Sequence, residues 1–216
     1  MTMAETTRLQ IAGLRLGGRP LVICDVDEVV VHFTRELEDH LDTHGLYLSP
    51  QSFALNGNVR RKFDDEPVAH DELMGHIDQV FAERTHIMQP IDGAIEALTA
   101  IAVAADIVLL TNLPHEAGDM RRENLKGLGL VQPVVTNSGP MGPAVRMLAG
   151  MAGGKVVFID DSPQFLASAF EYAPDVHLVH FLHDERFARH VPEADYVSLR
   201  TGRWDEALPH VQGLIA

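Results

Sequence analysis

The chain has 216 residues, a length that suits one domain with a modest insertion. Its 17 basic and 31 acidic residues give a formal net charge of −14, which argues against binding along a nucleic-acid backbone. A small anionic substrate is still compatible with this charge, because a bound metal ion can reverse the field locally.

The cysteine content and the hydropathy bear on the compartment. Cys24 is the single cysteine, so an intrachain disulfide is excluded and a reducing compartment is favoured. No apolar run reaches the length of a membrane span, and the first ten residues lack the basic and apolar regions of a secretion signal. We therefore expect a cytoplasmic protein that binds neither nucleic acid nor membrane; the sequence does not give its oligomeric state.

Short apolar runs alternate with helical patterns along most of the chain. The predicted buried strands are residues 21–24, 107–110, 156–159 and 176–181, with a weaker candidate at 134–136. Helices are predicted after Asp92, which can serve as the N-cap, after Ser162-Pro163, and from Trp204 to the end of the chain. This alternation predicts an α/β fold with a doubly wound parallel sheet.

Residues 33–90 break the alternation, since they contain no convincing buried strand. Helical candidates here are residues 34–44, a short turn that opens at Ser49-Pro50, and residues 70–84. Such a segment is far longer than an ordinary connection between a strand and a helix. We interpret it as a small helical cap inserted after the first strand, with residues 1–32 and 91–216 forming the core.

Polar side chains follow three of the predicted strands. Asp25, Asp27 and Glu28 follow the first strand, Thr111-Asn112 follow the second, and Asp160-Asp161 follow the strand at 156–159. Ligands of open parallel sheets bind outside the carboxyl ends of the strands, and clustered carboxylates suit Mg²⁺. A simpler interpretation of each group as a turn or helix cap remains open, most of all for Thr111-Asn112.

In this order, Asp25-Val-Asp27, Thr111 and Asp160-Asp161 resemble motifs one, two and four of the haloacid dehalogenase-like (HAD) superfamily. The resemblance implies that Asp25 is a nucleophile that forms an aspartyl-phosphate and that Asp27 is the general acid and base. It implies that Thr111, together with Asn112, contacts phosphoryl oxygens. Asp25, the carbonyl of Asp27, Asp160 and Asp161 would hold Mg²⁺, and residues 33–90 would be a C1-type cap.

The residue at position 27 distinguishes subtypes within this resemblance. Dehalogenating relatives lack an acid at this place, because a halide leaves without protonation, and transport ATPases carry threonine there. Aspartate at position 27 therefore favours phosphatase or phosphomutase chemistry. Since nothing in the sequence marks a second phosphate site, we favour a phosphatase with a small phosphorylated metabolite as the substrate.

The third motif of the superfamily, a lysine, has no counterpart, since its position falls on Met141. Arg146 downstream can serve instead, or the cap can supply the charge from Arg60-Arg61-Lys62, a run that can equally be a solvated surface. A catalytically silent relative that binds a phosphate ligand or a protein partner is the alternative function. The twelve histidines form no metal-ligand pattern in the sequence.

Overall fold

A computed structural model describes residues 3–216, so Met1 and Thr2, the start of the N-terminal stretch discussed above, lie outside it. Its centre is a six-stranded sheet in the order β5-β4-β1-β6-β7-β8, and all neighbouring strands are parallel. The strands are β1 Leu21–Cys24, β4 Asp106–Thr111, β5 Val134–Thr136, β6 Val156–Asp160, β7 His177–Phe181 and β8 Leu199–Thr201. The predicted doubly wound parallel sheet is therefore confirmed.

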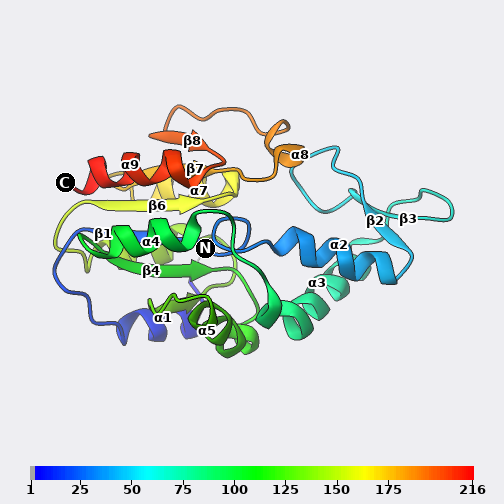
Figure 1. The fold of residues 1–216 in the computed structure, drawn as a ribbon, viewed down its shortest axis with the longest axis horizontal. Helices are drawn as coiled ribbons and strands as arrows, with labels where there is room; N and C mark the ends of the chain where they lie inside the picture. The colour runs from blue at the N-terminus through cyan, green and yellow to red at the C-terminus, as the bar shows by residue number, and fades with distance from the viewer. Residues whose placement is uncertain (1–2) are drawn as a thin grey trace.

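Helices cover both faces of this sheet (Figure 1). On one face lie α1 Glu5–Ala12, α6 Gly142–Ala149 and α7 Pro163–Tyr172, which pack with Leu21 and Ile23 of β1. On the other lie α4 Ala94–Ala102, α5 Gly118–Gly127 and α9 Trp204–Ile215, which pack with Val22 and Cys24. Alternate residues of β1 thus enter two separate cores, as expected for a strand buried on both sides.

The five predicted strands are present to within one residue at each end, because each is an apolar run buried on both faces. β8, with the sequence Leu-Arg-Thr, was missed because only Thr201 is buried. Asp92 does not cap α4: the helix begins at Ala94 after Gly93, whose φ of 81° is in the left-handed region. Glycine adopts this conformation without steric cost, which sets the start of the helix there.

The predicted cap segment contains α2 Phe33–Thr43, α3 His70–Arg84 and the short 3-10 helix η1 Thr85–Ile87. It also contains an antiparallel pair that the sequence did not predict, β2 Leu46–Leu48 and β3 Val59–Arg61. No helix opens at Ser49-Pro50; residues 49–58 form a loop instead. Asn58 fixes this loop, because its side chain accepts from Gln51 N (3.0 Å) and donates to the carbonyl of Ala54 (2.6 Å).

Two short elements complete the chain, η2 His115–Ala117 and α8 Glu185–Ala188.

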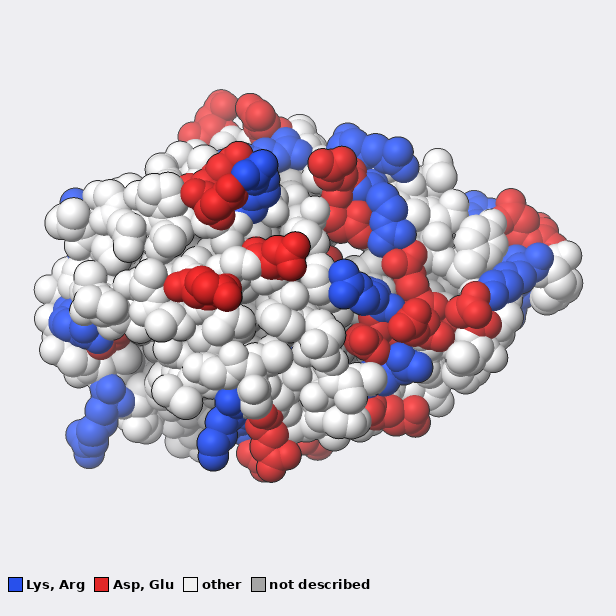
Figure 2. All heavy atoms as spheres, viewed as in Figure 1, with Lys and Arg blue, Asp and Glu red and all other residues white. Residues whose placement is uncertain are grey.

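In the view of Figure 2, acidic and basic side chains are interspersed over the half of the molecule that carries α2 and α3. No helix within residues 3–216 combines the length and apolarity needed to cross a lipid bilayer.

Candidate metal centre and pocket

Three carboxylates meet at the carboxyl ends of two adjacent strands. Asp25 follows β1, Asp160 ends β6 and Asp161 comes next, and the two strands pair so that Cys24 faces Ile159. The backbone N–H of Asp25 continues this ladder by donating to the carbonyl of Ile159 (2.9 Å). One oxygen from each carboxylate lies within 4.8 Å of the others. The two acidic motifs therefore lie together because β1 and β6 are neighbours in the sheet.

The electrostatics of this group are unfavourable without a cation. Burial, followed by repulsion from Asp160, Asp161 and Asp27, raises the pKa of Asp25 well above its usual value. Burial likewise raises the pKa of Asp160 and of Asp161. A positive ion among these oxygens would offset the cost of burying the charged carboxylates and the repulsion between them.

The hydrogen bonding of Asp160 also favours a bound cation. Its Oδ1 accepts from the backbone N–H of Ser162 (2.7 Å), while its buried Oδ2 has no partner within the described part of the chain. Buried polar atoms in proteins are nearly always paired. A carboxylate with one unpaired oxygen, close to two further carboxylates, fits the ligand set of Mg²⁺, a hard cation that prefers oxygen.

Asp27 faces a different environment from Asp25. Its Oδ1 accepts from Arg121 of α5 at 2.5 Å, and its Oδ2 accepts from the hydroxyl of Thr111 at 3.1 Å. Both partners are fully buried. The structure therefore turns Thr111 toward Asp27, and Thr111 is not among the residues that line the pocket.

Arg121 is the site residue that sequence reasoning missed. It lies in the charged run Arg121-Arg122-Glu123, which looks like a solvated helix face, yet its side chain is 0% exposed. Its Nε and Nη1 have no hydrogen-bond partner among residues 3–216, so Asp27 is its principal counter-charge. No local signal in the sequence distinguishes it from its half-buried neighbour Arg122.

Asn112 lines the pocket, and two hydrogen bonds fix its side-chain amide. Its Nδ2 donates to the carbonyl of Gly139 (2.8 Å), and its Oδ1 accepts from Asn137 (2.7 Å). These bonds fix the loop after β4 to the loop after β5. The amide is therefore fixed in orientation at the edge of the cavity.

The basic residues named as substitutes for the missing lysine do not reach this site. Met141, at the lysine position, is buried in the core between the sheet and α6. Arg146 lines a separate hollow beside Tyr172 and Asp175.

The basic run of the cap is also engaged elsewhere. Arg60 donates to the carbonyl of Asp65 (2.5 Å), and Arg61 forms a two-pronged ion pair with Glu72 (2.5 and 3.0 Å). The structure thus brings together Asp25, Asp27, Asn112, Asp160 and Asp161, but does not bring the predicted arginines to them.

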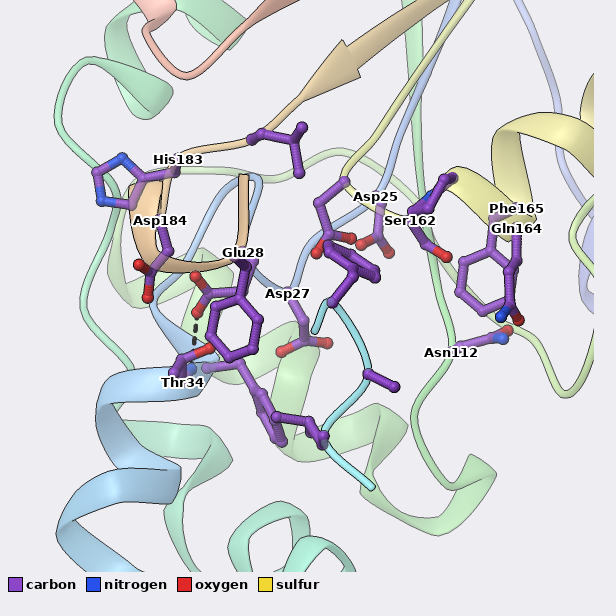
Figure 3. A pocket seen from close by; sticks show the side chains of 18 of the residues that line it. Asp25, Asp27, Glu28, Thr34, Asn112, Ser162, Gln164, Phe165, His183 and Asp184 are labelled. Atoms are coloured by element: carbon purple, nitrogen blue, oxygen red, sulfur yellow. Dashed lines mark hydrogen bonds between the residues drawn. The ribbon is translucent and has the colours of Figure 1, made fainter. Parts of the chain in front are cut away.

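A cavity of about 670 Å³ opens beside the carboxylates, between the carboxyl edge of the sheet and residues of α2, α3 and the loop 49–58 (Figure 3). Its floor is acidic, with Asp25, Asp27, Glu28, Asp161 and Asp184. Its walls are largely apolar, formed by Phe33, Phe53, Leu55, Met74, Ile77, Phe81, Phe165, Leu182 and Phe187. Among the residues that the structure describes, no lysine or arginine lines it, and His183 is the one basic group there.

Glu28 links the floor of the pocket to the first turn of α2. Its φ of 59° is unusual for a residue other than glycine, and its Oε1 accepts from the backbone N–H of Thr34 (2.7 Å) in the first turn of α2. Burial raises the pKa of Glu28 to about 7, although the bond from Thr34 opposes this shift. The strained backbone thus places an acceptor at the start of the cap, where the orphan N–H groups of a helix need one.

Solved structures share this architecture. YfnB of Bacillus subtilis, solved bound to magnesium, superposes with a TM-score of 0.61 at 13% identity, over 89% of this chain and 98% of that one. A haloacid dehalogenase-like hydrolase from Streptococcus pneumoniae gives 0.58 at 12% identity, over 90% and 99%. A haloacid dehalogenase-like hydrolase from Xanthomonas campestris gives 0.58 at 16% identity, over 91% and 96%.

The chain has the haloacid dehalogenase-like fold. Other proteins with this fold that match the chain include a defluorinating L-2-haloacid dehalogenase and a Thermotoga maritima protein with the provisional name β-phosphoglucomutase. No family model and no curated protein matches the sequence. The comparisons thus identify the HAD-like fold, whose members carry out more than one reaction, so the chemistry has to be argued from the site.

Proposed function

We propose that this protein is a Mg²⁺-dependent hydrolase that cleaves a small phosphate ester through an aspartyl-phosphate on Asp25. The observation that carries the proposal is the convergence of Asp25, Asp160 and Asp161, with Asp160 Oδ2 buried and unpaired. When bound there, Mg²⁺ would offset the negative charge of both the nucleophile and the phosphoryl group.

Each polar residue of the site can be given a role in this reaction. Asp25 lines the pocket, so one of its carboxylate oxygens can attack the phosphorus atom while the ester oxygen leaves. Asp27 would give that oxygen a proton and later take one from the water that releases phosphate from Asp25. Thr111 and Arg121 hold Asp27 in one orientation, and Asn112 offers an amide donor to phosphoryl oxygens.

The walls of the cavity indicate what is attached to the phosphate. Five phenylalanines line it and can pack against an apolar or aromatic group. The acidic floor also disfavours a leaving group with further negative charge. We therefore propose a monoester whose alcohol is apolar or aromatic.

Hydrolysis of an aryl phosphate with Mg²⁺ or with chelator tests the proposal, with a 2-haloacid as the competing substrate. We expect Mg²⁺-dependent release of phosphate and no release of halide. Asp25→Asn should lower the rate by on the order of 10³-fold or more, because it removes the nucleophile. Circular dichroism of the variant checks that the fold is retained; halide release without Mg²⁺ would contradict the proposal.

A second candidate, a silent relative that binds a phosphate ligand or a protein partner, is favoured by one observation. Met141 occupies the lysine position and is buried, and within the described chain no lysine or arginine lines the cavity. Loss of a fixed positive charge can cost on the order of 10²–10³ in rate. Mg²⁺ binding in calorimetry, without turnover of any phosphate ester in a panel, would support this candidate.

A further inference from the structure

Three histidines from two helices of the cap meet at one point, away from the carboxylates described above. His40 and His44 are four residues apart at the end of α2, so they lie on the same face of that part of the chain. His76 comes from α3, which packs against α2. One ring nitrogen from each lies within 4.8 Å of the others.

The three rings are close together, with His76 edge-on to the other two. Their centroids are 4.3 Å apart for His40 and His44, 5.2 Å for His40 and His76, and 5.1 Å for His44 and His76. His40 Nε2 and His76 Nδ1 form a hydrogen bond of 3.0 Å, so in the ion-free protein one of these two nitrogens carries the shared proton. Two nitrogens bound to one tetrahedral Zn²⁺ at roughly 2.0–2.1 Å would be separated by a little over 3 Å. The separation of this pair is therefore close to the one that the metal requires.

The third ring is already oriented by the backbone. His44 Nδ1 lies 2.8 Å from the carbonyl oxygen of His40, which can only accept, so Nδ1 carries the proton in that bond. The lone pair of His44 is then on Nε2. Metal-binding histidines typically donate their other N–H to a carbonyl in this way, which fixes the tautomer and the ring.

The surroundings of His40 and His76 favour the neutral form of these two rings. Burial, together with His44, His76 and Arg84, lowers the pKa of His40, and Glu83 opposes this. Burial and the charges of His44 and Arg61 lower the pKa of His76, and Glu72 opposes it. Neutral imidazole is the form that binds metal, so these two shifts favour the binding of an ion at His40 and His76.

We propose that His40, His44 and His76 form a second metal site, which takes a zinc-class transition ion and joins α2 to α3 within the cap. Imidazole nitrogens suit Zn²⁺, Cu²⁺ or Ni²⁺ and not Mg²⁺, so this site and the carboxylate site select different ions. His40 is buried, His76 is half-buried and His44 is exposed, so an ion can enter from solvent and keep an open coordination position. This proposal does not depend on the proposed hydrolase activity.

Titration of the full-length, metal-stripped protein with Zn²⁺ against a chromophoric chelator tests the site. Excess Mg²⁺ is kept in the buffer so that the carboxylates are occupied. We expect one tight site in the wild type, weakened on the order of 100-fold in His44→Ala and in His76→Ala. Because His44 is exposed, His44→Ala is expected to fold. The control His86→Ala removes an exposed histidine of η1 and should bind Zn²⁺ as the wild type does.

Two further measurements separate this site from adventitious binding. Zn²⁺ should raise the melting temperature of the wild type and of His86→Ala, but not that of His76→Ala. Co²⁺ should show the visible absorption of a tetrahedral or five-coordinate site in the same two proteins. Equal Zn²⁺ affinity in the wild type and His76→Ala, or an equal loss in His86→Ala, would overturn the proposal.

Discussion

The two aspartates after β1 lie two positions apart in the sequence but have opposite electrostatic surroundings. Asp25 faces Asp160 and Asp161, which are like charges, whereas Asp27 faces the guanidinium of Arg121 at 2.5 Å. The side chain of Asp27 is 17% exposed and that of Arg121 is 0% exposed. The same substitution at the two positions should therefore change stability in opposite directions.

We expect Asp25→Asn to stabilise the metal-free protein by about 1 kcal/mol, because it removes a buried charge from a group of like charges. Asp27→Asn should destabilise it by roughly 3 kcal/mol, because Arg121 would keep its buried charge without a counter-charge. Urea unfolding in chelator measures both. A loss of stability in Asp25→Asn as large as that in Asp27→Asn would show that repulsion does not govern this site.

At the scale of elements, the loop of residues 49–58 decides what the pocket can hold. Its anchor is Asn58, and it carries Phe53, Ala54 and Leu55 into the wall of the cavity. The ring of Phe53 lies edge-on to Phe187 of α8, with centroids 6.3 Å apart. The loop thus contacts α8, on another wall of the pocket, through an aromatic pair.

If the substrate has an apolar body, Phe53→Ala should lower kcat/KM for aryl phosphates about tenfold, since a lost aromatic contact is worth roughly 1–2 kcal/mol. It should have little effect on acetyl phosphate, which is too small to reach the wall. Phe63→Ala is the matched control, because Phe63 also lies in the cap segment but is 82% exposed. An equal effect of both variants, or an equal loss for both substrates, would contradict a specific role of the loop.

The ion pair between Arg121 and Asp27 joins two elements, and no local pattern in the sequence reveals it. α5 supplies the guanidinium and the loop after β1 supplies Asp27, and the two residues are 94 positions apart. Likewise, the arginines at 60 and 61 look available in the sequence but are engaged by Asp65 and Glu72 within the cap. Whether a charge is free depends on its partners, and those are set by packing of elements distant in the chain.

For the whole molecule, the metal centre and the stability of the fold should be linked. β1 and β6 lie at the middle of the sheet, and the three carboxylates sit at their ends. An ion that binds there binds the folded chain and not the unfolded one, because Asp25 and Asp160 meet only when the two strands pair.

We expect Mg²⁺ at 100 times its Kd to raise the free energy of unfolding by about 2.7 kcal/mol. Asp160→Asn should abolish this increase, while Asp175→Asn, an exposed residue beside the separate hollow, should retain it. Thermal unfolding at constant ionic strength measures the effect. An equal increase in both variants would place the stabilising ion elsewhere.

The sequence alone determined the class of the fold and the acidic motifs, because both are local. A strand buried on both faces is a nearly continuous apolar run, so β1, β4, β6 and β7 are visible as short runs. Residues directly after such strands must lie at the carboxyl edge of the sheet, which placed Asp25 and Asp160 without knowledge of the coordinates.

Only the tertiary structure decided which charges pair, which side chains line the pocket and which histidines meet. The contact of Arg121 with Asp27, the turn of Thr111 away from the cavity and the cluster of His40, His44 and His76 each join separate elements. The β2–β3 pair was also missed, because two three-residue strands carry too little apolar pattern to be recognised. Periodicity reports which face of an element is buried, and the residue that covers that face is fixed only when the elements pack.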